Sequence, residues 1–155
     1  MLEKTSTADP EVRRLYVDFV READGRLGIE LSDDAEKGPP LDLEPPNGVL
    51  LLARVAGEPA GLAGVRHLET DVAEVKSMYV VPAHRGRGLG RLLLREVEEI
   101  ATAHGCSHAR LDTSDYLTDA IRLYRSAGYR EVPDYNGNAK ANLWFQRPLT
   151  GADQL

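Results

Sequence analysis

The fold is decided by the stretch YVVPAHRGRGLGRLLLREVEEI, which runs from Tyr79 to Ile100. It opens with aromatic and β-branched residues, which are typical of a strand. Its second half has apolar residues at a spacing of three to four, which predicts a helix with one buried stripe. The stripe consists of Leu89, Leu92, Leu93, Val97, Ile100 and Ala101, and Gly105 is expected to end the helix. The stretch therefore predicts a strand, a glycine-rich turn and a helix in that order.

The turn between this strand and helix has the composition of an anion site. A helix N-terminus carries roughly half a positive charge and favours acids, but here arginines alternate with glycines. Glycines allow a tight turn and leave several N–H groups accessible to a ligand. A phosphate-sized anion is one interpretation, and a solvated turn whose arginines lie along the surface is the other. The residues are Arg85, Gly86, Arg87, Gly88, Gly90 and Arg91.

Two common phosphate-binding motifs do not fit these letters. A Walker loop needs Lys-Ser or Lys-Thr after its last glycine, but Gly90 is followed by Arg91. A dinucleotide fingerprint needs glycines at its first, third and sixth positions, and neither Gly86 nor Gly88 has a glycine five places further on. The pattern that does fit is R-x-x-G-x-G, formed by Arg85, Gly88 and Gly90 directly after a strand.

This motif resembles the coenzyme-binding segment of the GNAT superfamily of acetyl-CoA-dependent N-acetyltransferases. Two further segments are similar to the family. Glu74 to Val80, EVKSMYV, looks like its fourth strand, and Ala120 to Tyr129, AIRLYRSAGY, looks like its late helix. The resemblance covers roughly residues 49–149, and three motifs in the right order are more specific than one glycine loop.

The resemblance implies one N-acetyltransferase domain over residues 1–155 with an α/β (α+β) fold. Its central sheet is expected to be mixed and mostly antiparallel, with a parallel, splayed strand pair at the coenzyme site and helices on both faces. Acetyl-CoA is the implied cosubstrate, with its pyrophosphate on the amides of the turn and its pantetheine arm along the preceding strand. The implied coenzyme-binding residues are Met78, Tyr79, Val80, Arg85, Gly86, Arg87, Gly88, Leu89, Gly90 and Arg91.

Acetyl transfer to an amine needs a neutral amine and a proton for the leaving thiolate. By its match to the late helix of the family, Tyr124 is assigned as the general acid, the alternative being an ordinary core tyrosine. Glu74, on the strand beside the thioester, is assigned as the base, acting directly or through water. The alternative for Glu74 is an exposed acid paired with Lys76 or with a neighbouring strand. Asp112 is the second candidate for the base.

The coenzyme side of the expected site has one further feature and one departure from the family. A backbone N–H at Met78 or Tyr79, where the strands splay, is expected to donate to the developing oxyanion. Relatives often have Asn three residues before the alanine of the late helix, but this chain has Leu117 there. Nearby Ser114, Asp115 or Thr118 could take over that coenzyme contact, or it is absent.

Outside this core, periodicity predicts several further elements. Asp9 and Pro10 suit the start of a helix, which apolar residues from Val12 to Ala23 continue as far as Gly25. A first strand over residues 2–6 rests on the family comparison. Residues 49–56 and 59–68 predict a hairpin, in which Gly61 and Gly64 mark a bulge or a close backbone approach.

The C-terminal third should contain the rest of the sheet. Residues 108–113 predict a strand, which a right-handed crossover through the preceding helix makes parallel to the strand before the turn. Thr118 or Asp119 can cap the late helix, and Gly128 ends it. Residues 129–132 and 142–147 predict two final strands, and the turn-rich segment 133–140 between them is expected to border the acceptor.

Residues 25–48 predict an irregular acidic loop. Acids alternate there with prolines and glycines, a composition that interrupts regular structure. Long loops in compact domains are often binding segments, so these carboxylates could recognise a cationic acceptor. A solvated acidic surface is the alternative. The acids are Glu30, Asp33, Asp34, Glu36, Asp42 and Glu44.

Composition excludes several classes of protein. The 155 residues are 42% hydrophobic and 28% charged, as in an ordinary soluble domain. No apolar run reaches the roughly 20 residues of a membrane helix, and the first ten residues lack an apolar signal core, so a cytoplasmic protein is expected. A net charge of −6 argues against nucleic-acid binding. Cys106 is the sole cysteine and four histidines show no ligand spacing, so no metal is predicted.

Three functions are compatible with these features. The first is an enzyme that acetylates a primary amine of a small molecule by direct transfer. The second is a non-catalytic coenzyme A-binding regulatory module, in which Tyr124 and Glu74 would be structural residues. The third is acetylation of protein lysines or N-termini, which shares the chemistry and differs in the acceptor groove. Family habit also makes a homodimer possible.

Overall fold

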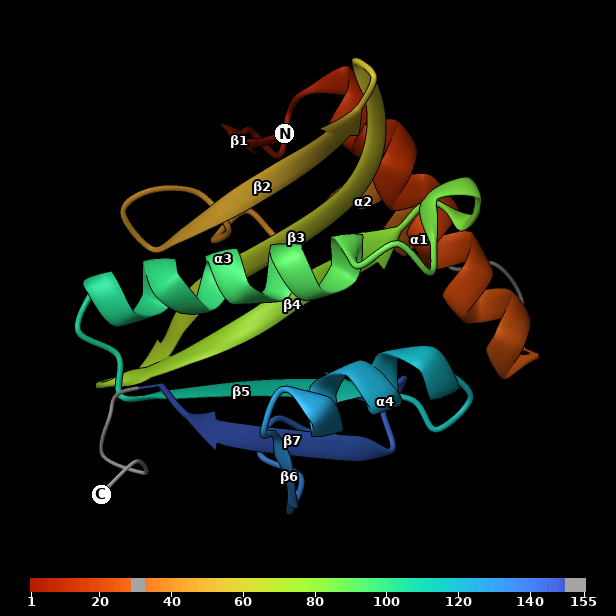
Figure 1. The fold of residues 1–155 in the computed structure, drawn as a ribbon. Coiled ribbons are helices and arrows are strands. Elements are labelled where there is room, and N and C mark those ends of the chain that lie inside the picture. The colour runs from red at the N-terminus through yellow and green to blue at the C-terminus, as the bar shows by residue number, and fades with distance from the viewer. Residues whose placement is uncertain (29–32, 150–155) are drawn as a thin grey trace.

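The computed structural model describes residues 1–28 and 33–149, which form a seven-stranded sheet flanked by helices (Figure 1). The strand order is β1-β2-β3-β4-β5-β7-β6. In chain order the elements are β1 (Leu2–Thr5), α1 (Pro10–Leu27), α2 (Asp34–Lys37), β2 (Gly48–Val55), β3 (Glu58–Glu69), β4 (Val72–Val80), the 3₁₀ helix η1 (Pro82–His84), α3 (Leu89–Ala103), β5 (His108–Thr113), α4 (Thr118–Ser126), β6 (Arg130–Val132) and β7 (Leu143–Pro148). The predicted α/β fold class is confirmed.

The central feature of the sheet is the pair formed by β4 and β5. Among the strands of the described chain, this pair alone is parallel, and its register joins residues 72–74 to 108–110. By contrast, β4 stays paired with β3 as far as Val80, and β5 stays paired with β7 as far as Thr113. The two strands therefore separate beyond residues 74 and 110, as Figure 1 shows. The mixed sheet with a splayed parallel pair is as predicted.

A β-bulge at Ser77 changes the direction of the second half of β4. A single β3 residue, Ala63, lies opposite both Ser77 and Met78. Ser77 has a φ of 56°, a left-handed conformation that is uncommon outside glycine. The extra residue reverses the alternation of the side chains. Met78 consequently packs in the same core cluster as Val75, and Tyr79 packs in the cluster on the opposite face.

The glycines of β3 lie at close contacts, as the sequence predicts. A Cβ atom at Gly61 would stand 2.9 Å from the carbonyl oxygen of Tyr79 on β4. A Cβ atom at Gly64 would stand 2.7 Å from Cδ1 of Leu43, a fully buried residue that covers β3. The register of β3 on β4 is also irregular between Leu62 and Gly64. The close backbone approach is confirmed at Gly61 and the bulge between Leu62 and Gly64, whereas the close contact of Gly64 is with a side chain.

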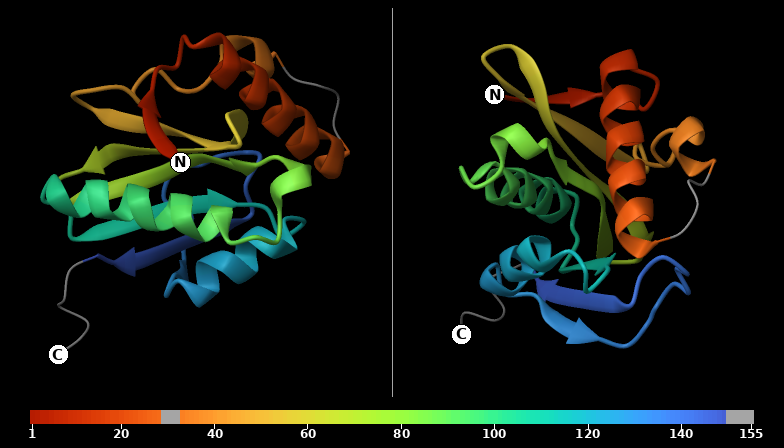
Figure 2. Two further views of the ribbon diagram at one scale, coloured as in Figure 1. Left: turned by 45° about the horizontal axis from the view of Figure 1, so that its top comes forward. Right: turned by 90° about the vertical axis from the view of Figure 1, so that its right-hand side faces the viewer.

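Two hydrophobic clusters cover the two faces of the sheet. Helices α3 and α4 lie on one face, and α1 and α2 lie on the other (Figure 2). Leu93 and Val97 of α3 belong to the first cluster, together with Tyr124 of α4. Val12 and Leu15 of α1 belong to the second. The stripe predicted for α3 is mostly confirmed, but Leu92 is 44% exposed, whereas its neighbour Leu94 is buried.

Helix ends differ most from the sequence prediction. Helix α1 continues through Gly25 and ends at Gly28, whose φ of 70° and N–H bonds to Asp24 and Gly25 carbonyls form the cap. Gly25 therefore lies inside the helix. Helix α4 starts after Leu117, and neither predicted cap, Thr118 or Asp119, occupies the N-cap position.

The N-terminal half otherwise follows the prediction. Strand β1 is present, and β2 and β3 form the expected hairpin, with a turn at Ala56 and Gly57 whose φ values are both positive. In the predicted irregular loop the described residues contain the single turn α2, and residues 29–32, including Glu30, lie outside the described part. No helix within residues 1–28 and 33–149 is both long and apolar enough to cross a membrane.

We predict that Gly48→Ala destabilises the protein strongly. A Cβ atom there would stand 2.4 Å from the carbonyl oxygen of Asp42 and 2.6 Å from that of Val65. Because both contacts are with backbone, the chain must move, and the expected loss is about 2–3 kcal/mol in the free energy of unfolding. Chemical denaturation measures this loss.

The matched control is Gly25→Ala, whose Cβ atom would have no atom within 4 Å. This helical position should gain up to about 1 kcal/mol, because alanine has less conformational entropy to lose than glycine. A shift in the same direction for both variants would contradict this account of the 42–48 segment.

Candidate active site

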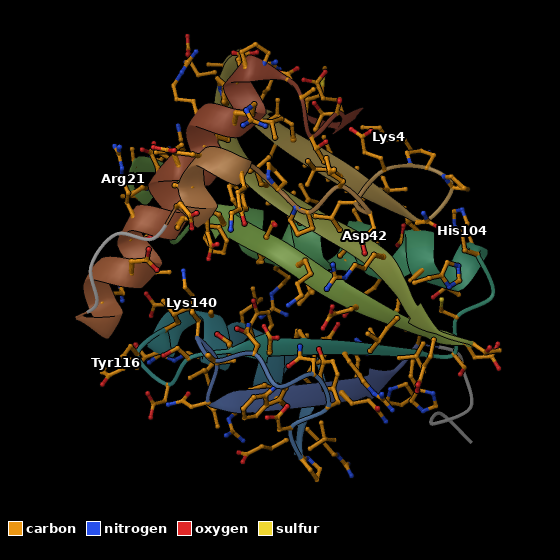
Figure 3. All side chains as sticks on the ribbon, turned by 180° about the vertical axis from the view of Figure 1, so that it is seen from behind. Lys4, Arg21, Asp42, His104, Tyr116 and Lys140 are labelled. Atoms are coloured by element: carbon orange, nitrogen blue, oxygen red, sulfur yellow. The ribbon has the colours of Figure 1, made fainter. Side chains whose placement is uncertain are left out.

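A cavity of about 500 Å³ lies where β4 and β5 separate. Its wall is built by α1 and α2, the bulge of β4, the end of β5, the start of α4 and the segment between β6 and β7. Lys140 and Tyr116, two residues of this wall, lie between α1 and the half of the molecule that contains β5 and β7 (Figure 3). Asn136, Asn138 and Lys140 of segment 133–140 line the cavity, and the position of this segment beside the acceptor stays a prediction.

Tyr124 lies in the wall of this cavity. Helix α4 carries it, and its ring packs against Tyr129 and Phe145 with centroid distances of 5.9 and 6.4 Å. The residue is 5% exposed. Burial raises the pKa of its phenol, and the negative charge of Asp112 raises it further. The phenol therefore keeps its proton over the physiological pH range and is available to donate it.

The glycine-rich turn connects β4 to α3 and presents an open backbone. Gly86 and Gly88 have φ values of 79° and 82°, and a Cβ atom at either would have no atom within 4 Å. Gly88 is the N-cap of α3, with no side-chain cap and no acid in the first turn. The N-terminus of α3 can therefore take an external anion. Gly90 has a different role, because a Cβ atom there would lie 3.3 Å from Leu123 of α4.

The arginines of this turn do not all face one point. Arg85 donates to both carboxylate oxygens of Glu22 on α1, at 3.0 and 2.7 Å, and to the carbonyl oxygen of Val80 at 2.8 Å. Arg91 donates to the hydroxyl of Ser126 on α4 at 2.8 Å. Arg85 and Arg91 are thus bonded to two different helices and are not both directed at one anion site. Arg85 joins the turn to α1 because a carboxylate of α1 lies within reach.

Glu74 is fully buried and does not line the cavity. Its Oε1 accepts from Arg66 on β3 at 2.8 and 3.0 Å. Its Oε2 accepts from the hydroxyl of Tyr135 at 2.5 Å and from Nδ2 of Asn136 at 3.2 Å. Glu74 is therefore not an exposed acid, but both expected pairings are present, with Arg66 of the neighbouring strand β3 and, at 3.8 Å, with Lys76. The bonds from Tyr135 and Asn136 hold segment 133–140 against the sheet.

Asp112, by contrast, is a carboxylate of the cavity wall. Its Oδ2 lies 3.0 Å from Nζ of Lys76 and accepts from Asn136 at 2.6 Å and Asn138 at 3.2 Å. Lys76 and Asp112 lie two residues beyond the last parallel pair, so this ion pair spans the gap as it opens. Burial alone would raise the pKa of Asp112, but the charge of Lys76 and these hydrogen bonds outweigh burial and lower it.

Turn-rich composition predicts the segment 133–140 but not which of its side chains contact the sheet. Asn136 and Asn138 line the cavity and bond to Asp112 on β5, whereas Tyr135 does not line it and donates to Glu74 on β4. Asx turns at Asp134 and Asn136 are the one local clue to an ordered segment. Leu117 and Ser114 also line the cavity.

The acids of the 25–48 loop are mostly paired with the protein itself. Asp42 lies 2.9 Å from Arg66, and Glu44 accepts from Ser6 and Thr7. Asp34, which lines the cavity, lies 3.0 Å from Lys140. The side chains of Asp34 and Asp42 are 44% and 46% exposed, so they are partly solvated as the alternative expected, but each is also paired with a cation of the protein. Across the described residues, no three His, Cys, Asp or Glu side chains are grouped so as to hold a metal ion.

Comparisons with known proteins give a consistent result. The model of the acetyltransferase (GNAT) family matches residues 10–129. An uncharacterized N-acetyltransferase of Schizosaccharomyces pombe is 32% identical over 146 residues, or 88% of this chain and 85% of the relative. The IAA acetyltransferase of Azospirillum brasilense is 34% identical over 151 residues, or 94% of this chain and 97% of the relative. The structure of an aminoglycoside 6'-N-acetyltransferase complexed with coenzyme A has the same fold, with a TM-score of 0.71 at 15% identity and 97% of each chain covered.

We predict that Asp112→Asn destabilises the protein at neutral pH and that this loss shrinks in acid. The pKa of Asp112 is lower in the folded state than the value of about 3.9 for an unfolded chain. Its ionised form therefore stabilises the fold above about pH 4, and this contribution is lost as the pH falls through the folded pKa. Denaturation of both proteins between pH 3 and 7 measures the difference.

Asp119→Asn is the control, because the side chain of Asp119 is 92% exposed. Its free energy of unfolding should stay close to that of the wild type at each pH. A loss for Asp112→Asn that is as large at pH 3 as at pH 7 would show that charge pairing with Lys76 is not the cause.

Proposed function

We propose, on the premise that the chain belongs to the acetyltransferase (GNAT) family, that it transfers an acetyl group directly to a primary amine of a small molecule. As a member of this family it is an acyltransferase, and its cosubstrate is acetyl-CoA. The observation that carries the proposal is the meeting of two features at one cavity, the separation of β4 and β5 and the phenol of Tyr124, with the open glycine turn directly following the separated end of β4.

The residues present fit coenzyme A. The open backbone at Gly86 and Gly88 and the start of α3 at Leu89 would hold the pyrophosphate, with Arg87 and Arg91 close in sequence to add positive charge. Met78, Tyr79 and Val80, the part of β4 that has separated from β5, would pair with the pantetheine arm. We propose a different role for Arg85, which is to fix the turn to α1 through Glu22.

The thioester of acetyl-CoA supplies an activated acetyl group, and this chain supplies its surroundings. The bulge at Ser77 leaves a main-chain N–H of Met78 or Tyr79 as the proposed donor to the developing oxyanion. Tyr124 would donate to the departing sulfur. Because burial makes loss of its proton costly, its first effect would be a hydrogen bond that stabilises the thiolate.

The acceptor must also lose a proton before it can attack. Glu74 remains a candidate base only through an intervening group, because it does not line the cavity itself and its oxygens accept hydrogen bonds from Arg66, Tyr135 and Asn136. Asp112 lines the cavity, but its lowered pKa makes it a weak base. We therefore propose that the amine gives its proton to water and that Glu74 acts by holding the acceptor wall in place.

The alternatives have weaker support. A non-catalytic regulatory module that binds coenzyme A would need the glycine turn. It would not need a protonated phenol, such as that of Tyr124, in the wall of the cavity. A protein substrate needs an open groove, whereas Lys140 bridges this cavity to α1. The aminoglycoside 6'-N-acetyltransferase, whose name describes a small-molecule amine, supports a similar class of acceptor here. A cytoplasmic location and a homodimer stay predictions.

We predict that Gly88→Ala weakens acetyl-CoA binding by about tenfold or more. Gly88 has a φ of 82°, so alanine strains the turn, and its methyl group would occupy the open side proposed for the pyrophosphate. A tenfold loss corresponds to about 1.4 kcal/mol. Calorimetric titration with acetyl-CoA measures the dissociation constant.

Gly137→Ala is the matched control, since Gly137 has a similar φ of 67° and open space around its Cβ position, but lies in the segment between β6 and β7. This variant should have comparable strain and unchanged acetyl-CoA affinity. Equal affinities for both variants would mean that the pyrophosphate does not bind at Gly88.

We predict that Tyr124→Phe lowers kcat by a factor of about 10²–10⁴ while acetyl-CoA still binds, because the phenol acts on the leaving sulfur. The assay is release of free thiol from acetyl-CoA with a panel of primary amines. Tyr129→Phe is the control, because Tyr129 is a buried neighbour that donates to Glu98 instead of lining the cavity. It should lose stability but retain kcat.

The same assay tests the role of Glu74 through Glu74→Gln. If Glu74 only positions the wall, the pH profile of kcat/KM keeps its shape and follows the free-amine fraction. Loss of a pH-dependent limb in Glu74→Gln would instead identify Glu74 as the base.

For the other prediction, a kcat of Tyr124→Phe equal to that of the wild type would contradict the assignment of Tyr124 as the general acid.

A further inference from the structure

Lys140 forms two ion pairs on the side of the cavity proposed for the acceptor. It comes from the segment between β6 and β7, and its Nζ lies 2.8 Å from Oδ1 of Asp24 on α1 and 3.0 Å from Oδ2 of Asp34 on α2. In Figure 3 the residue lies between α1 and the half of the molecule that contains β5 and β7. These three residues, which we name the Lys140 bridge, join segments that are 116 residues apart in sequence.

The bridge belongs to the wall that an acceptor must contact. Lys140 and Asp34 both line the cavity, and Asp24 is fully buried behind them. Two carboxylates share the ammonium group of Lys140, so the three side chains together carry one negative charge. Burial by itself would lower the pKa of Lys140, but the hydrogen bonds and charges of Asp24 and Asp34 outweigh it and raise the pKa. The ammonium is therefore retained at neutral pH.

The second carboxylate of the wall is paired in the same manner. Asp112 lies 3.0 Å from Lys76, and both residues line the cavity. Each of the two cavity-lining carboxylates, Asp34 and Asp112, thus has a lysine of the same wall within 3.0 Å. An ammonium group brought in by an acceptor would compete with tethered ammonium groups, whose effective concentration is of the order of millimolar. The wall therefore offers little extra binding energy to a second cation.

We propose that Lys140 determines acceptor specificity by occupying, with its own ammonium, the position that a second cationic group of the acceptor would take. The enzyme accordingly binds diamines no better than acceptors of the same length with one amine. This inference rests on the proposed transfer to small-molecule amines, and it gives the acidic loop a different role from recognition of a cation. Asp34 of that loop serves to hold Lys140.

The test uses pentylamine and 1,5-diaminopentane as matched probes. Ligand-observed NMR titration of the coenzyme A-bound protein gives a dissociation constant for each probe without requiring turnover. The wild type should bind the diamine no better than the monoamine. Lys140→Met should raise the affinity ratio in favour of the diamine by about tenfold, because Asp34, the carboxylate of the bridge that lines the cavity, becomes available to its second ammonium.

Three further variants make the result specific. Lys37→Met removes the other lysine near Asp34, at 3.6 Å, but from outside the cavity, and should leave the ratio unchanged. Lys140→Gln keeps a hydrogen-bond donor without the charge and should also raise the ratio, which covers the case in which Lys140→Met does not fold. The double variant Lys140→Met with Asp34→Asn should lose part of the gain.

A ratio within twofold of the wild type in both Lys140 variants would overturn the proposal, as would an equal rise in Lys37→Met. Failure of the proposed function has a different signature, which is absence of thiol release from acetyl-CoA with every amine tested. The two failures are therefore distinguishable, because the binding ratio does not depend on catalysis.

Discussion

The separation of β4 and β5 is the constraint on which the rest of the structure depends. Parallel strands normally continue their hydrogen bonds along their length, but here pairing stops after residues 74 and 110. Each strand keeps its other neighbour, β3 or β7, so the sheet remains intact while a gap opens at its centre. The bulge at Ser77 turns the end of β4 toward the glycine turn. A site for an extended ligand therefore arises from backbone geometry before any side chain is considered.

Ion pairs between buried carboxylates and cations of other segments hold in place the segments that border this gap. Glu74 and Asp24 are fully buried, and Asp112 nearly so, yet each lies against a cation from a different segment: Arg66, Lys140 and Lys76. Removing one partner of a buried pair typically costs about 3–5 kcal/mol, so these contacts fix the segments that carry them. Segment 133–140 has little apolar surface of its own, and its bonds to Glu74 and Asp112 replace a hydrophobic anchor. Ion pairs also fix the glycine turn, where Arg85 pairs with Glu22 of α1.

The sequence predicts those helices, strands and turns that depend on nearby residues. The strand, turn and helix from Tyr79 to Ile100, the β2–β3 hairpin and the parallel position of β5 follow from periodicity, glycine placement and crossover handedness. Gly25 misled the prediction of α1, because an isolated glycine inside a helix costs only about 1 kcal/mol and packing outweighs it. The surroundings of Glu74 were beyond prediction, since Tyr135 and Asn136 lie 61 and 62 residues away in sequence. Lys140 illustrates the same limit, because its partner on α1 is still further away.

The most direct test of this account is a structure of the complex with acetyl-CoA. The account predicts that the pyrophosphate lies on the backbone amides of residues 86–91 and that the acetyl group lies in the gap between β4 and β5. Its carbonyl oxygen should accept a hydrogen bond from the main-chain N–H of Met78 or Tyr79, with the sulfur beside the hydroxyl of Tyr124. A coenzyme bound outside this gap, or a carbonyl oxygen facing no main-chain donor of β4, would contradict it.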